Sequence, residues 1–156
     1  MPDQKTRGKK KDQQVSLDNL GLEMGNKPPQ ALDVEEAVLG AMLLEPNCVD
    51  QAMEELQADC FYDPKHRQIF EAMSKLVLDH TSIDIITVSS KLKETGTREM
   101  VGGAVTLANL SENVGSAAHI EYYVKILKQK KIQRDLISAS CDILHDAFDE
   151  SIKVDD

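Results

Sequence analysis

Helix starts and stops follow one another closely after residue 30, and they constrain the fold more than any other feature of the sequence. Proline at the first position of a helix loses no N–H that the helix needs, so Asp63 followed by Pro64 predicts a helix start. Asp84 is a typical capping residue, and it predicts a helix over 85–95 that stops at Gly96. A set of short helices separated by tight turns is therefore expected.

The segment between residues 30 and 60 is expected to hold two helices. Asp33 stands three residues before Glu36, which predicts a capping box at the start of the first helix. Pro46 ends that helix, and Asn47 is then available to cap a second, shorter one. Apolar residues recur at helical spacing in both: Val34, Val38, Leu39 and Met42 in the first, and Val49, Ala52, Met53 and Leu56 in the second.

Two stretches after residue 80 have alternative interpretations. The run Ile83–Val88 is rich in β-branched residues, so a short strand competes there with the helix that the Asp84 cap favours. Gly102 and Gly103 are adjacent and could hold a phosphate, but a helix C-cap followed by a tight turn is the interpretation we favour. Another short helix is expected before residue 115.

The composition favours an all-α fold. Hydrophobic residues make up 41% of the chain and aromatic residues only 4%, so aliphatic side chains must fill the core. Such residues favour helix packing over a sheet sandwich. Cys48, Cys60 and Cys141 are odd in number and widely spaced, so we expect buried free thiols rather than a disulfide or a metal site.

The last segment is predicted to be one long helix over 117–149, opened by Ser116. Its apolar residues form a heptad seam with a polar interruption at Lys130 and Arg134. The first part of this helix is expected to pack on the preceding helices, and the second part to meet a partner, because no sequence remains to cover it. The two rows of the seam are Ile120, Leu127, Arg134, Cys141 and Phe148, and Tyr123, Lys130, Ile137 and Leu144.

Charge divides the chain into a basic start and an acidic body. The formal net charge is −9, although residues 1–30 hold more Lys and Arg than Asp and Glu. An acidic body argues against a dedicated DNA-binding domain, because phosphates are neutralised by clustered cations. Residues 1–29 are predicted to be a disordered polar tail. Because neither a signal peptide nor a membrane span is recognisable, a soluble cytoplasmic protein is expected.

Catalytic motifs are not recognisable in the sequence. The stretch over 21–27 only imitates a phosphate-binding loop, since its spacing is wrong and Pro28 follows. The four histidines are scattered, and although Asp63, His66 and Glu71 lie together at one helix start, no nucleophile stands near them. We therefore expect no enzymatic activity, no cofactor and no metal in this chain.

A basic cluster on the long helix has several possible roles. Its residues cover more than one face, which is unlike a clean groove-binding stripe. A solvated helix face is the simplest interpretation, contact with acidic partner surfaces comes next, and direct DNA contact last. The cluster consists of Lys125, Lys128, Lys130, Lys131 and Arg134.

Four stretches in order resemble the N-terminal domain of DnaB-type replicative helicases. They are PPQALDVEEAVLGAMLLEP, ADCFYDPKHRQIFEAM, SIDIITVSSKL and VGGAVTLANLSENVGSAAHIEYYVKILKQKKIQRDLI. Together they cover nearly everything from residue 28 to about 150. The resemblance implies an orthogonal multi-helix globular head over 30–115, and a long helix over 116–150 that is the first arm of a helical hairpin. Residues 151–156 would begin the turn, and the second arm and the ATPase domain, with its ATP and Mg²⁺, would lie outside this chain.

The resemblance also implies a role in DNA replication. Such domains pair and build a collar above a hexameric motor ring, and the collar receives the helicase-binding domain of primase in the primosome, with a helicase loader as another possible partner. The hairpin positions that the family uses in such contacts match Ile137 and Ile143. Asp33 falls where the family usually has an acidic residue, whereas Thr106 stands where relatives often carry an aromatic one. The predicted self-association residues are Ile137, Cys141, Ile143, Leu144 and Phe148.

Three other interpretations of the sequence remain. The chain could be the helicase-binding C-terminal domain of a primase, which would bind a helicase collar while staying monomeric. It could be a stand-alone helical protein-interaction scaffold. A nucleic-acid-binding module would use the Lys-rich start and the long helix, and its DNA affinity would fall steeply with salt.

Overall fold

The computed structural model describes residues 26–153 and 155, and these residues form helices and no strand. The predicted all-α class is therefore confirmed over the described residues. The tail over 1–29 and the imitation phosphate loop over 21–27 lie almost wholly outside them. The helices are α2 (Leu32–Leu44), α3 (Pro46–Glu55), α4 (Pro64–Leu78), α5 (Ile85–Glu94), α6 (Arg98–Val101), α7 (Gly103–Glu112) and α8 (Ile120–Phe148), with 3-10 turns η1 (Ala58–Cys60) and η2 (Ala117–His119).

The chain divides into two compact units within α8. Residues Pro29–Asp135 form one unit, which we call the head unit, and the second unit contains Leu136 and the residues after it. The head unit therefore includes the first half of α8 as well as α2 to α7.

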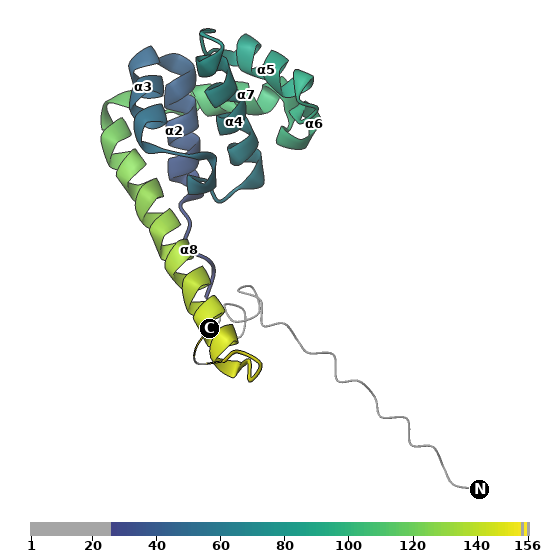
Figure 1. Cartoon of the computed structure of the whole chain (residues 1–156). Coiled ribbons are helices and arrows are strands. Elements are labelled where there is room, and N and C mark those ends of the chain that lie inside the picture. Colours follow the sequence, from purple (N-terminus) through teal and green to yellow (C-terminus); the bar gives the residue numbers. More distant parts are fainter. Residues whose placement is uncertain (1–25, 154, 156) are drawn as a thin grey trace, which may run out of the picture. The chain divides into compact units, whose positions relative to one another are not determined.

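Helix α2 forms the centre of the head unit. It contacts α3, α4 and α7, and in Figure 1 α7 crosses it while α3 lies beside it. Val38 and Leu39 on α2 are fully buried, and the rings of Phe61 and Phe70 lie against each other with their centroids 4.9 Å apart. Aliphatic side chains fill most of this core, as the composition predicts.

The first half of α8 belongs to this core. Ile120, Val124 and Leu127 are almost completely shielded from water. The prediction that the part of the helix from Ile120 to Leu127 packs on the preceding helices is therefore confirmed. Ser116 opens this region as predicted, because its hydroxyl accepts a hydrogen bond from the N–H of Ala118 in η2.

Two predicted helix starts are confirmed in detail. The Asp63 carboxylate accepts from the N–H of Lys65, and Pro64 occupies the first position of α4. Asp84 accepts from the N–H of Thr87, whose hydroxyl in turn accepts from the N–H of Asp84. This reciprocal pair fixes the start of α5 and rules out the competing strand.

Two other predicted caps are wrong. Helix α2 begins at Leu32, so Ala31 holds the cap position without a side-chain bond, and Asp33 lies in the first turn. Asn47 does not cap α3 either, because Pro46 is already at its first position and Glu45 is the residue before the helix. Pro46 fits both roles, since its missing N–H and its ring prevent α2 from continuing, whereas its fixed φ suits the first position of α3.

Glycines explain two tight places in the head unit. A Cβ at Gly40 would overlap the carbonyl of Leu110 and the side chain of Val114, so glycine permits the close approach of α2 and α7. Gly102 has φ +93° and Gly103 has φ +68°, a region that favours glycine. Gly102 is the C-cap of the short helix α6, which was not predicted, and Gly103 begins α7, so the pair forms the predicted cap and turn.

The three cysteines are free thiols, but only two of them are buried. Burial raises the pKa of the Cys60 and Cys48 thiols, and the nearby Glu45 carboxylate raises that of Cys48 further. Cys141 is only half-buried, so the expectation of burial is wrong there. Among the described helices, none has the length and apolarity needed to cross a bilayer.

Candidate protein-interaction surfaces

The predicted self-association residues lie on the part of α8 that belongs to the second unit. Phe148 is 79% exposed, Ile143 70% and Leu144 42%, whereas Ile137 and Cys141 are half-buried. Large apolar side chains at these levels of exposure are candidates for burial against a partner.

Helical geometry places the apolar residues of 136–148 in two rows. Each residue advances by about 100° around the helix axis, so residues three, four and seven apart share a face. The row found from the sequence contains Ile137, Cys141, Leu144 and Phe148. A second row contains Leu136, Ile143 and Ala147, and Leu136 in it is 62% exposed. Leu136 was not predicted, although its spacing of seven from Ile143 is a usable signal.

The predicted basic cluster is largely engaged within the head unit. The Lys128 ammonium lies 2.7 Å from the Glu55 carboxylate, and this bond raises the pKa of Lys128 and lowers that of Glu55. Lys131 pairs with Asp135 on the next turn and with Asp59, at 3.5 Å, which raises the pKa of Lys131. Two of the five cations therefore bind acidic groups of their own chain.

Arg134 connects three segments that are far apart in the sequence. Its guanidinium donates to the carbonyl of Pro29 at 2.9 Å and to those of Asp59 and Cys60, each at 3.1 Å. It also lies over the Tyr62 ring, 5.7 Å from the centroid. One of the two polar residues that interrupt the heptad seam is thus an anchor of the head unit, and this role was not predicted because backbone carbonyls leave no sequence signal.

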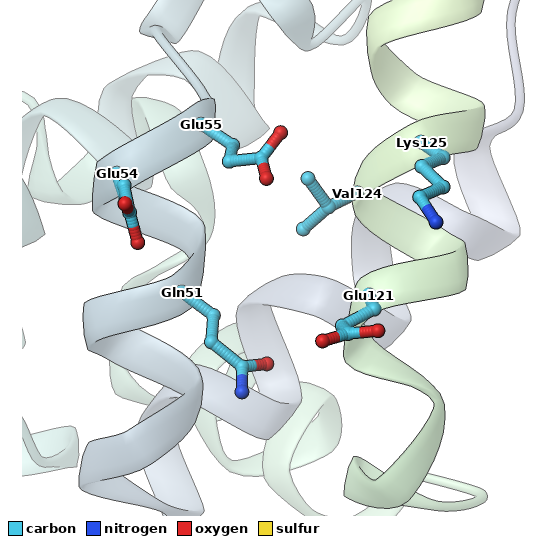
Figure 2. A pocket seen from close by; sticks show the side chains of 6 residues that line it. All are labelled: Gln51, Glu54, Glu55, Glu121, Val124 and Lys125. Atoms are coloured by element: carbon cyan, nitrogen blue, oxygen red, sulfur yellow. The ribbon is translucent and has the colours of Figure 1, made fainter.

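An acidic pocket lies between α3 and α8 (Figure 2). Gln51, Glu54 and Glu55 line it from α3, and the Val124 side chain extends from α8 toward them. Glu121 and Lys125 complete the lining, so carboxylates outnumber ammonium groups there. This surface of α8 would repel phosphates, which disfavours the interpretation of the helix as a DNA-binding element.

A buried Glu–His pair joins α2 to the start of α4. The Glu35 side chain is 1% exposed, and its carboxylate accepts from the backbone N–H groups of Tyr62 and Asp63. It also lies 2.7 Å from Nδ1 of His66, which is 94% buried as a residue. A buried carboxylate with three hydrogen bonds is well compensated for its lost hydration. His66 was noted in the sequence together with Asp63 and Glu71, whereas Glu35 was not predicted.

His66 also lines a pocket of about 280 Å³, which we call the His66 pocket. Residues of α2, α4 and α7 and the residue that ends α7 form it, and most of them are polar. They are Glu36, His66, Thr106, Asn109, Leu110 and Asn113. Among the described residues, no group of three or more His, Cys, Asp and Glu side chains is placed to hold a metal ion.

Comparisons with known proteins agree with one another. Residues 27–129 match the family described as DnaB-like helicase N terminal domain. The chain is 38% identical over 136 residues to the replicative DNA helicase DnaB of Rhodothermus marinus, covering 83% of this chain and 14% of that protein. It is 40% identical over 129 residues to the replicative DNA helicase DnaC of Bacillus subtilis, covering 83% of this chain and 28% of that one.

A solved structure gives the same result for the fold. The N-terminal domain of DnaB helicase from Mycobacterium tuberculosis superimposes with a TM-score of 0.76 at 31% identity, and the match covers 80% of this chain and 91% of that one. The chain spans only 14% and 28% of the length of the two helicases named above, whereas it matches nearly all of an isolated N-terminal domain. The chain therefore belongs to the family of DnaB-like helicase N-terminal domains.

Proposed function

We propose that this chain is the collar-forming domain of a replicative DNA helicase, which self-associates through α8 and recruits primase or a helicase loader. In this proposal unwinding depends on a motor domain with ATP and Mg²⁺ outside the chain, and the chain itself has no catalytic role. The relatives are named replicative DNA helicases, and they are far longer than the part that matches this chain. This difference in length supports a motor domain that is separate from the matched domain.

The observation that carries the proposal is the pair of apolar rows over 136–148. Two rows on one helix allow contact with two neighbours, one along each row. Ile143 and Leu136 occupy one row, and Leu144 and Phe148 the other. In a helical hairpin one row would face the second arm, and the other would face a second copy of the chain.

The alternative interpretations have less support. The family match names helicase N-terminal domains, which disfavours a primase fragment. Ion pairs of Lys128 and Lys131 with acidic side chains, together with the acidic pocket between α3 and α8, disfavour a nucleic-acid-binding module.

Ile143→Asp tests the self-association. An isoleucine buried fully is worth about 1.5–3 kcal/mol, and in a two-fold interface each substitution counts twice. With 70% of its surface available, Ile143 should contribute about 2–4 kcal/mol per dimer, which is a change of roughly 30-fold to 1000-fold in the dissociation constant. Sedimentation equilibrium of the full chain measures this change.

Ile86→Asp is the matched control. Ile86 is 80% exposed on α5 in the head unit, so the same substitution removes a comparable apolar surface away from the proposed contact. We expect the dissociation constant of this variant to equal that of the unmodified chain. Equal sedimentation of the Ile143→Asp and unmodified chains, or equal weakening by both substitutions, would refute self-association through the row that contains Leu136 and Ile143.

A further inference from the structure

Glu35 determines which nitrogen of His66 is available for binding. The Glu35 carboxylate already accepts two backbone N–H bonds, so as an acceptor it requires a proton on Nδ1 of His66. In the neutral imidazole this leaves Nε2, on the opposite side of the ring, with a free lone pair. Glu35 does not line the His66 pocket whereas His66 does, so Nε2 is the ring nitrogen left for the pocket.

Nε2 of His66 has no hydrogen-bond partner among residues 26–153 and 155. The residue is 94% buried, but Nε2 is not among the described buried side-chain atoms that lack a partner, so water can reach it from the pocket, and a donor of a bound group would replace that water. The pocket volume of about 280 Å³ exceeds that of a single water molecule, which occupies about 30 Å³ in the liquid. The pocket therefore has room for a side chain that carries donors.

The other polar groups of the pocket can also accept hydrogen bonds. Glu36 contributes a carboxylate, Asn109 and Asn113 contribute amide oxygens, and Thr106 contributes a hydroxyl oxygen. The negative charge of Glu36 and the acceptor oxygens that surround the His66 pocket suit a flat cation that has many hydrogen-bond donors. The guanidinium of arginine has five N–H donors in a fixed fork, whereas the ammonium of lysine has three on one atom.

We propose that the His66 pocket binds an arginine side chain of a protein that docks on the head unit, with Nε2 of His66 and the Glu36 carboxylate as its acceptors. This proposal rests on the proposed function, in which the domain recruits another protein, and it names the chemistry that such a protein must offer. The pocket itself lies wholly within the head unit and needs no second copy of the chain.

The test uses a capped arginine and a neutral control of the same shape. We would label the full chain with ¹⁵N-histidine and record the ring nitrogen shifts of His66 while adding acetyl-arginine-amide or acetyl-citrulline-amide. Before any addition, the shifts should identify Nδ1 as protonated and Nε2 as the free acceptor. Acetyl-arginine-amide should shift the Nε2 resonance with saturation, and acetyl-citrulline-amide, which lacks the charge, should bind at least about threefold more weakly.

Two variants locate the site. Glu36→Gln should weaken the binding of acetyl-arginine-amide by about threefold or more, because an exposed charge pair is lost. Glu54→Gln makes the same chemical change on α3, outside the pocket, and should leave the affinity unchanged. A protonated Nε2 in the free chain, no saturable shift, equal shifts with both compounds, or equal effects of both variants would overturn the proposal.

The outcome is separable from that of the proposed function. The capped arginine reports on the pocket without any partner protein, so its binding can succeed or fail whether or not primase binds. Calorimetry with the helicase-binding domain of a primase measures recruitment on its own. Absence of that binding, with normal arginine binding, would count against primase recruitment and leave the pocket assignment standing.

Discussion

Replacement of Gly40 by alanine should test how closely α2 and α7 must approach each other. An ideal Cβ at this position would overlap the carbonyl oxygen of Leu110 and Cγ2 of Val114, and would lie 3.0 Å from the carbonyl carbon of Leu110. The obstacle is mostly backbone, which cannot rotate away as a side chain can. The two helices would therefore have to separate, and the contacts of buried Leu110 would weaken.

Two opposing terms give the size of the effect. Alanine in place of glycine within a helix gains about 1 kcal/mol from intrinsic propensity. Overpacking of a closely packed contact costs about 1–3 kcal/mol, and an overlap with backbone belongs at or above the upper end. The expected net loss in the free energy of unfolding is about 2 kcal/mol, which for a unit of this size lowers Tm by roughly 8 °C.

Urea unfolding of the full chain, followed by circular dichroism of the helices, measures this loss. Gly115→Ala is the matched control, because a Cβ at Gly115 meets no atom within 4 Å and its backbone angle is not in the glycine region. That variant should be as stable as the unmodified chain, or up to about 1 kcal/mol more stable. A Gly40→Ala chain as stable as the control would refute the argument that glycine is required for the α2–α7 contact.

Two further predictions concern the anchor residue and the thiols. Arg134→Gln should lower the free energy of unfolding by about 2–3 kcal/mol, because three carbonyls lose a charged donor. Lys128→Gln should lower it by less than about 1 kcal/mol, because only a surface ion pair is lost. Urea unfolding of both variants measures these losses, and equal losses would contradict the anchoring role of Arg134. Iodoacetamide at pH 8 should modify half-buried Cys141 before Cys48 and Cys60, because burial raises the pKa of these two thiols and leaves little reactive thiolate. Mass spectrometry measures the order of labelling, and faster labelling of either buried thiol would contradict it.

Local signals in the sequence predicted local structure well. Asp63 and Asp84 cap their helices because the capped N–H groups lie two or three residues further along the chain, so the signal and its partner are read together. The long helix was also predictable, because few other secondary structures are compatible with an apolar repeat at helical spacing over so many residues. The exposed residue Phe148 followed from the same repeat, whereas exposed Ile143 lies outside that repeat and was predicted only from the family resemblance.

The features that escaped prediction depend on distant parts of the chain. Asp33 looked like a cap, but the neighbouring Glu35 binds the backbone at Tyr62, 27 residues away, and this contact is part of how α2 is placed. Arg134 looked like a polar break in an apolar seam, although its partners are carbonyls at Pro29 and Cys60. Partners of this kind have no side-chain signature, so the sequence alone could not show them.

The hydrogen bond between Arg134 and Pro29 also has a consequence for the order of events during synthesis. It joins residues 105 positions apart, so Pro29, the first residue of the head unit, cannot form this bond until nearly all of the head unit has been synthesised. Translation proceeds at about 5–20 residues per second, and within the head unit the core side chains of α8 are also the last to be made. A nascent head unit would therefore expose apolar core surface along the face that Leu127 and Arg134 later cover, and transiently exposed surface of this kind is prone to aggregate.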